Sequence, residues 1–348
     1  MEEARKTDLV GSTPEEIGAL LSALDEPPYR GTQIFRWIHR HRARSFREMT
    51  VLPLPLREAL EARFRIDLPR RTERVGPGPD GAVKDLFLLQ DGAAVEAVRI
   101  AGEDGATLCV SSQAGCRYGC AFCATARGGF RRSLTAGEIA GQLLVQEEPV
   151  RRVVYMGMGE PLANYRNTVR SVRLLVHPEG AAIPPRRITL STAGLVPLID
   201  RLAAEELGLR LAVSLNASND EIRRRLMPIA ERWPIEALLA AADRFARQSG
   251  APVTFEYVLL AGVNDGDEHA RELARRLAPI RCKVNLIPFN PVPSLPWRGP
   301  TESRIESFLR ILAPRLVATV RRSAGSGIDA ACGQLRLRTA PPEERNAR

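Results

Sequence analysis

The stretch Cys116-Arg-Tyr-Gly-Cys120-Ala-Phe-Cys123 places three cysteines in one short loop directly after a strand-like run. Three thiolates at this spacing can bind one metal centre from adjacent backbone, but no histidine lies in the loop to complete the four ligands of a structural zinc. An iron–sulfur cluster with one iron free of protein ligands needs no fourth residue. The spacing therefore predicts such a cluster, with three reduced structural cysteines as the alternative.

From Thr107 onward, apolar strand-like runs alternate with amphipathic helical stretches. The predicted strands are residues 107–111, 152–158, 187–191, 209–215, 253–260 and 283–288. Each is followed by a predicted helix, at residues 136–147, 167–176, 196–205, 235–247, 269–277 and 302–312. Six β/α units with no closing pair predict an α/β fold, an open partial (β/α)6 barrel whose chemistry lies at the carboxyl ends of the strands.

The sequence on either side of the barrel has a different character. Residues 1–65 are predicted to form a small helical domain. Its first helix begins at the Ser12-Thr13-Pro14-Glu15 start signal, and two further helices are predicted at about residues 32–41 and 56–65. Short alternating runs broken by Gly and Pro predict a β-rich connector over residues 66–105. The barrel is assigned to residues 106–322, including a seventh strand-like run at 316–322, and residues 323–348 form a C-terminal extension that carries Cys332.

The overall charge permits a polyanionic partner. Fifty Lys and Arg residues against 41 Asp and Glu give a net charge of +9, and only three of the cations are lysines, Lys6, Lys84 and Lys283. No apolar run approaches the length of a membrane span, and the acidic start is unlike a signal peptide, so we expect a cytoplasmic protein. Six cysteines are too few for a disulfide scaffold in a chain of 348 residues.

Two basic stretches are candidates for contact with nucleic acid. Between Arg30 and Arg47 lie six arginines, two histidines and no acidic residue, interleaved with aromatic residues. The alternative is a solvated charged face over apolar residues that belong to the core. The second stretch comprises Arg310, Arg315, Arg321, Arg322, Arg336 and Arg338.

Further segments sharpen the interpretation of the cysteine loop. They are residues 108–116, 122–125, 156–162, 255–260, 285–291 and 328–335, together with 28–30, 33–35 and 48–50 near the N-terminus. Over nearly the whole chain these segments resemble the RlmN/Cfr family of radical S-adenosylmethionine (SAM) RNA adenine methyltransferases. The N-terminal segments resemble the RlmN type.

The resemblance implies a role for five of the six cysteines. Cys116, Cys120 and Cys123 would hold one [4Fe–4S] cluster whose open iron binds SAM. Cys332 would accept a methyl group from a first SAM, lose a hydrogen atom to the radical made from a second, and then bond to the adenine carbon. Cys109 would release the product through a transient disulfide with Cys332, whereas Cys282 matches no catalytic position.

The base that removes the ring proton matches Glu96, which from its alternation with apolar neighbours alone would be a solvated strand residue. By the same resemblance the SAM contacts are Gly159, Glu160, Ser191, Ser214, Leu215, Asn216 and Asn290. Two departures are visible: the family usually has His where this chain has Asn216, and residues 323–327 lack the family's usual Arg and acid.

The resemblance implies methylation of C2 of adenine 2503 in 23S rRNA, with C2 of adenine 37 in tRNA as a further substrate. The implied partners are these RNAs and an electron donor protein, and we expect a monomer. The C8 methylation of the same rRNA adenine is the alternative within the family. A zinc-stabilised RNA-binding protein without activity is the alternative from another class.

Overall fold

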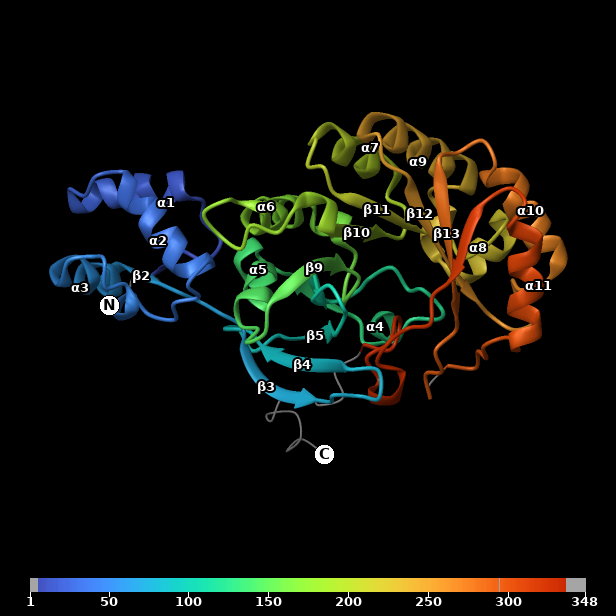
Figure 1. Ribbon diagram of the computed structural model, residues 1–348, viewed down its shortest axis with the longest axis horizontal. Coiled ribbons are helices and arrows are strands. Elements are labelled where there is room, and N and C mark those ends of the chain that lie inside the picture. The colour runs from blue at the N-terminus through green and yellow to red at the C-terminus, as the bar shows by residue number, and fades with distance from the viewer. Residues whose placement is uncertain (1–5, 294, 336–348) are drawn as a thin grey trace.

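The core of the molecule is one open sheet of ten strands, seen in a computed structural model that describes residues 6–293 and 295–335 (Figure 1). The strand order is β14-β13-β12-β11-β10-β9-β6-β5-β4-β3. The strands from β6 to β14 in this order are parallel. Their bounds are β6 Ala106–Cys109, β9 Val150–Tyr155, β10 Ile188–Thr192, β11 Arg210–Ser214, β12 Val253–Leu259, β13 Cys282–Pro288 and β14 Val317–Val320.

Helices connect the parallel strands, as the alternating pattern predicts. They are α5 Ala136–Leu144, α6 Tyr165–Val176, α7 Val196–Ala204, α9 Ile235–Ser249, α10 Asp267–Leu277 and α11 Glu302–Leu312, with the shorter α4 Ala124–Arg127 and α8 Asp220–Leu226. Apolar residues of the central strands, among them Phe255 and Val284, are fully buried. The two outermost strands of the sheet do not pair with each other, so the predicted open (β/α)6 barrel is confirmed.

The region predicted as a connector is part of the same sheet. Strands β3 (Arg70–Val75), β4 (Ala82–Leu88) and β5 (Ala94–Ile100) add to β6 in antiparallel order. The sequence marks these strands and their turns but not their continuity with the barrel, because that pairing is long-range. Its consequence for the site is that β5 lies directly beside Cys109, the last residue of β6.

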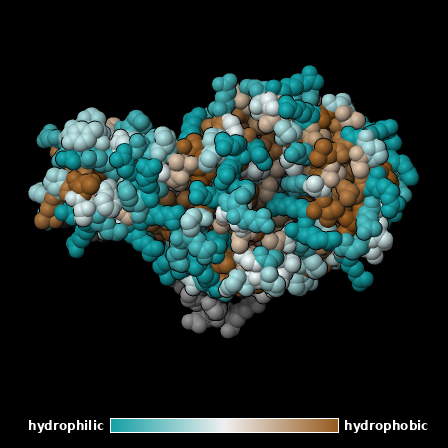
Figure 2. Space-filling view, in the orientation of Figure 1, coloured by the Kyte–Doolittle hydropathy of each residue, from teal (hydrophilic) through white to brown (hydrophobic). Residues whose placement is uncertain are grey.

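The N-terminal module consists of α1 (Pro14–Leu21), α2 (Tyr29–His39) and α3 (Leu54–Arg63), with β1 (Thr7–Asp8) pairing with β2 (Phe64–Arg65). The predicted second and third helices begin a few residues too late, because the chain enters both through a proline, Pro28 and Pro53. In Figure 1 the module lies at one end of the molecule, beside α5 and α6. Figure 2 shows a mostly hydrophilic surface with hydrophobic patches on the module and on the barrel.

A buried histidine lies within this module and makes its stability depend on pH. His39 is 1% exposed, stacks on Phe35 at 4.2 Å between ring centroids, and places Nε2 3.1 Å from the carbonyl oxygen of Val10. Burial lowers the pKa of His39 from 6.5 to about 4. Between about pH 6.5 and 4, His39 therefore binds a proton in the unfolded chain but not in the folded chain.

The free energy of unfolding should accordingly fall by about 3 kcal/mol through His39 alone as the pH drops from 7 to 4. His39→Gln keeps a side-chain donor but removes this titration. The gap in the free energy of unfolding between wild type and variant should therefore shrink by about 3 kcal/mol from pH 7 to pH 4. Urea unfolding at both pH values measures it.

None of the helices in the described ranges is both long enough and apolar enough to cross a membrane.

Candidate active site at the barrel mouth

The cysteine loop is held at its base by a short hairpin that the sequence does not reveal. Strands β7 (Gln113–Gly115) and β8 (Phe130–Ser133) are antiparallel and flank the loop and α4. Gly115 has a φ of +81°, and a Cβ there would collide with the carbonyl group of Gly129. The loop therefore begins at a glycine because the two arms of the hairpin come into close contact at that point.

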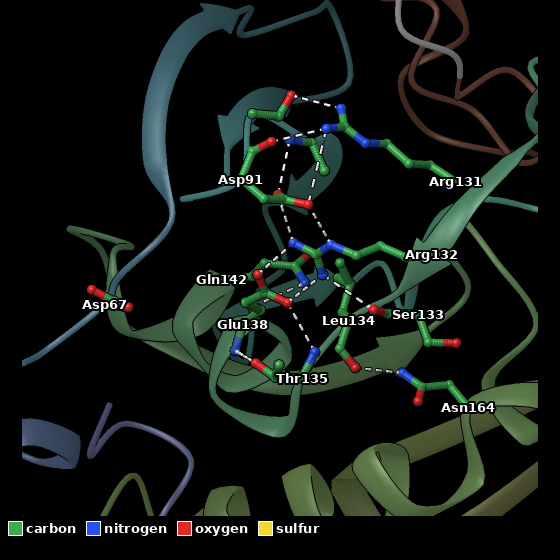
Figure 3. Close-up of polar contacts among 12 residues, drawn as sticks. Asp67, Asp91, Arg131, Arg132, Ser133, Leu134, Thr135, Glu138, Gln142 and Asn164 are labelled. Carbon is green, nitrogen blue, oxygen red and sulfur yellow. Dashed lines mark hydrogen bonds and ion pairs between the residues drawn. The ribbon is translucent and has the colours of Figure 1, made fainter. Parts of the chain in front are cut away.

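A network of charged side chains anchors this hairpin (Figure 3). Arg132 of β8 donates to Asp91, in the turn between β4 and β5, at 2.7 and 2.8 Å. It also donates to Glu138 in the first turn of α5 at 2.7 and 2.8 Å. The hydrogen bonds from Arg132 hold the pKa of the Asp91 carboxyl well below its usual range. The amide of Asn164 donates to the carbonyl oxygen of Leu134 at 2.7 Å, so the base of the loop is fixed from several sides.

One cavity at the carboxyl ends of the strands collects most of the predicted site residues. Its empty space, counted out to the open mouth, measures about 990 Å³. The predicted residues that line it are Cys116, Cys120, Cys123, Gly159, Glu160, Ser191, Ser214, Asn216, Asn290 and Cys332. Leu215, Cys109 and Glu96 do not line it.

The three loop cysteines form a donor set that suits a positively charged cluster. Burial raises the pKa of Cys116 to about 11, and burial together with the nearby Cys123 and Cys116 raises that of Cys120 well above its ordinary value. A bound metal centre would offset this cost, since thiolates are its ligands. No three His, Cys, Asp or Glu side chains of the described ranges are grouped to hold one metal ion.

Glu160 places a buried carboxylate opposite the cysteine loop. Its oxygens accept hydrogen bonds from the backbone of Leu162 at 2.9 Å and of Ala193 at 2.6 Å. Burial nevertheless raises the pKa of Glu160 to about 7. The preceding Gly159 has a φ of +97°, and a Cβ there would collide with Gln113. Gly159 is therefore required by its close packing against Gln113, and the buried carboxylate of Glu160 favours an ammonium group beside it.

The strand ends on the far side of the cavity are held together by Arg223, which sequence reasoning missed. Arg223 is fully buried and donates to the carbonyl oxygens of Leu215 at 3.2 Å and Ala193 at 2.7 Å. The backbone of Leu215 is thus committed to the support of the site. In the sequence Arg223 belongs to the run Arg223-Arg224-Arg225, which has the signature of a solvated helix face.

Asn216, a predicted SAM contact, lines the cavity next to the end of β11. It has a φ of +59°, a left-handed conformation that Asn tolerates better than most residues. Its side-chain oxygen accepts from the backbone of Val258 at 2.8 Å, and its amide nitrogen lies 3.2 Å from the sulfur of Met227. The Asn216 side chain is therefore bonded within the protein, although it lines the cavity.

The segment that carries Cys332 is docked over the cavity. Asn290 donates to the carbonyl oxygen of Cys332 at 3.2 Å and to the hydroxyl of Ser323 at 3.1 Å. The backbone of Ala124, the residue after the last loop cysteine, donates to the carbonyl of Gly333 at 2.7 Å. Figure 1 shows this segment in red against α4. These contacts place Cys332 beside the cysteine loop.

Cys332 also lines a second, smaller cavity, and Cys109 lies in its wall. Both cysteines are free thiols. Burial, and next the nearby Cys332, raise the pKa of Cys109 to about 12. Cys332 therefore stands between the first cavity and Cys109. Cys282, on β13, lines neither cavity.

Arg321 was a sequence candidate for RNA contact, and the structure places it elsewhere. Among the described residues that line either cavity it is the only one with a cationic side chain. Its Nη1 lies 3.7 Å from Oε1 of the buried Glu256 and 3.5 Å from the sulfur of Met156. The nearby Cys332 is the largest cause of a raised pKa of Arg321. The side chain is thus directed to the cysteine pair.

The remaining basic candidates have mixed outcomes. In the N-terminal stretch, most arginines bond within the protein: Arg30 to Glu26 and Gln33, Arg36 to Glu179, Arg42 to Gln146, and Arg47 to Glu61. Only Arg40 and Arg44 lack a side-chain bond to any part of the chain that the structure describes. Arg310 and Arg315 are exposed and Arg322 pairs with Glu302, whereas Arg336 and Arg338 lie outside the described residues.

Glu96 is 3% exposed, so its interpretation as a solvated strand residue is wrong. Its carboxylate pairs with Lys84 at 3.2 Å. The side chain turns inward because β5 is covered on that face by the segment of Cys332.

The fold and the cysteine loop together define a radical SAM protein. Residues 110–274 match the model of the radical SAM superfamily, and residues 7–66 match that of the ribosomal RNA large subunit methyltransferase N-terminal domain. A crystal structure of a radical SAM methyltransferase from Sphaerobacter thermophilus superimposes with a TM-score of 0.91, at 46% identity, over 95% of this chain and 99% of that chain.

Full-length relatives narrow the assignment. The chain is 45% identical to the probable dual-specificity RNA methyltransferase RlmN of Symbiobacterium thermophilum, over 97% of this chain and 93% of that protein. It is 44% identical to the dual-specificity RNA methyltransferase RlmN of Syntrophus aciditrophicus, over 92% of this chain and 94% of that protein. The chain belongs to the RlmN family of radical SAM methyltransferases, which confirms the resemblance drawn from its motifs.

Proposed function

We propose that the chain methylates C2 of adenine 2503 in 23S rRNA and C2 of adenine 37 in tRNA through an S-methylated Cys332. The observation that carries this proposal is the position of Cys332. It lines the cavity of the three loop cysteines on one side and the cavity of Cys109 on the other. A methyl carrier needs both neighbours, one to load and activate the methyl group and one to release the product.

In this proposal Cys116, Cys120 and Cys123 hold one [4Fe–4S] cluster. Glu160 and Gly159 receive the amino group of SAM, and Ser191, Ser214, Asn216 and Asn290 complete its site. Leu215 does not line the cavity and supports the site through its hydrogen bond from Arg223. The bound cofactors supply the radical chemistry and take back the odd electron, with two SAM molecules used in each turnover.

The remaining steps belong to this chain. The sulfur of Cys332 attacks the methyl group of the first SAM, and S-adenosylhomocysteine leaves. After loss of one hydrogen atom, the methylene carbon bonds to C2 of adenine. Glu96 takes the proton from C2. The thiolate of Cys109 attacks the sulfur of Cys332, a disulfide forms as the sulfur–carbon bond breaks, and the released carbon takes up a proton to become the methyl group.

Burial accounts for the different roles of the two cysteines. Cys109 is buried and does not line the SAM cavity, so its sulfur is not placed to take the methyl group of SAM. Cys332 lines that cavity and is half-buried. SAM therefore methylates Cys332, and Cys109 is kept for the release step.

The choice of C2 over C8 is supported by the N-terminal module and by the relatives. Residues 7–66 match the N-terminal domain of the ribosomal RNA methyltransferases, and the full-length relatives bear the RlmN name. Methylation at C8 remains the second candidate within the family, since it would use the same cysteines.

Nucleosides from a strain lacking the gene test this function. We expect 2-methyladenosine to disappear from 23S rRNA and tRNA by mass spectrometry, and to return with the wild-type gene but not with Cys332→Ser. Persistence of 2-methyladenosine in the deletion strain contradicts the proposal, and loss of 8-methyladenosine instead would establish the C8 activity. We further propose that the enzyme acts as a monomer in the cytoplasm with a separate electron donor protein.

A further inference from the structure

One face of the sheet beneath Cys332 carries a row of side chains from neighbouring strands. Lys84 of β4 lies opposite Val98 of β5, and Val98 lies opposite Cys109 of β6. Directly opposed residues share a face of the sheet, as do residues two apart on one strand. Lys84, Glu96 and Cys109 therefore face the same side, on which Val98 and Cys109 line a small cavity together with Ala330, Ala331 and Cys332.

The ammonium group of Lys84 touches both the base and the methyl-carrier segment. Its Nζ lies 3.2 Å from Oε1 of Glu96 and donates to the carbonyl oxygen of Asp329 at 3.1 Å. Asp329 precedes Cys332 by three residues. Lys84 is 8% exposed and Glu96 is 3% exposed, so bulk water does little to stabilise either charge.

A buried carboxylate is stable as an anion only beside a compensating charge. A carboxyl group that has already taken a proton cannot accept the one from the adenine ring. Lysine suits this position because its compact ammonium has three donors that can serve unlike acceptors, while arginine presents a flat fork. It is notable that a chain with three lysines among fifty cations places one of them here.

We propose that Lys84 is a positioning residue that holds Glu96 as an aligned carboxylate and links it, through the carbonyl of Asp329, to the docked segment of Cys332. The inference rests on the proposed function, in which Glu96 removes the C2 proton. The adenine bonded to Cys332 and the base that acts on it are then located by the same side chain. A segment displaced from the sheet would take the Asp329 carbonyl away from Lys84.

The test measures two steps separately in Lys84→Met, the methylation of Cys332 and the resolution of the Cys332–RNA adduct. Methylation of Cys332 from the first SAM, followed by peptide mass spectrometry, should stay within about twofold of the wild type. Resolution of the Cys332–RNA adduct should slow by about 100-fold, the usual share of a general base. Lys84→Arg keeps the cation but not the compact set of donors, so it should recover only part of that rate. Lys283→Met, which removes an exposed lysine on β13, should behave as the wild type.

A double variant distinguishes positioning from a merely structural role. If Lys84 acts through Glu96, Lys84→Met should add no further slowing in a Glu96→Gln background. Additive slowing, or unaltered adduct resolution in Lys84→Met, would overturn the inference. Should Lys84→Met fail to fold, Lys84→Gln is measured in the same way with the same expectation. An unmethylated Cys332 in the wild type, or full activity of Glu96→Gln, would instead count against the proposed function.

Discussion

Replacing Cys109 with alanine should leave the substrate RNA covalently attached to Cys332. Cys109 and Cys332 line one small cavity, and no other cysteine of the described ranges lines it. Without the second thiol the sulfur–carbon bond has no attacking group, so product release should fall by at least about 100-fold while the adduct accumulates. A denaturing gel reveals the protein–RNA species, and nuclease digestion followed by peptide mass spectrometry locates the nucleotide on Cys332.

The matched control is Cys282→Ala, which removes a cysteine of β13 that lines neither cavity. It should turn over like the wild type and form no lasting adduct. Unaltered turnover in Cys109→Ala would remove the resolving role from Cys109. Accumulation of S-methylated Cys332 without attached RNA would place the block before bond formation, which is also contrary to the proposed sequence of steps.

The fold is predictable from the sequence where the determinants are local. The parallel strands are buried, so their sequences are continuous apolar runs, and the helices between them carry an apolar face. Each β/α unit can therefore be recognised from its own stretch of sequence. The hairpin of β7 and β8 is not predicted from the sequence, because its strands are three and four residues long and lack an alternation of apolar and polar residues. The union of β3, β4 and β5 with the barrel depends on contacts distant in sequence.

The candidate site divides in the same way. The spacing of Cys116, Cys120 and Cys123 is a local signal and points to its chemistry directly. The inward direction of Arg321 and the burial of Lys84 are not local, because each depends on a partner from another strand or from the segment of Cys332. In a sequence, such cations have the appearance of solvated residues.

Replacing Cys120 with alanine should abolish both the cluster and turnover. Cys120 is the middle ligand of the loop and stands close to Cys116 and Cys123, so the two that remain cannot hold a cubane with an open iron. Anaerobically prepared wild type should be brown and oxygen-sensitive, and Cys120→Ala should lose bound iron, inorganic sulfide and the visible absorption. Turnover should fall by more than about 1000-fold.

Cys332→Ala is the informative companion, because it should keep iron, sulfide and colour while losing turnover equally. The pair then separates the residue that holds the cluster from the residue that carries the methyl group. A colourless wild-type protein that binds one zinc, tolerates air and releases it in Cys120→Ala would contradict the cluster. That result would favour an RNA-binding protein stabilised by metal. The proximity of Cys332 to Cys109 would then have no catalytic explanation, because a structural zinc site does not require a second pair of free thiols.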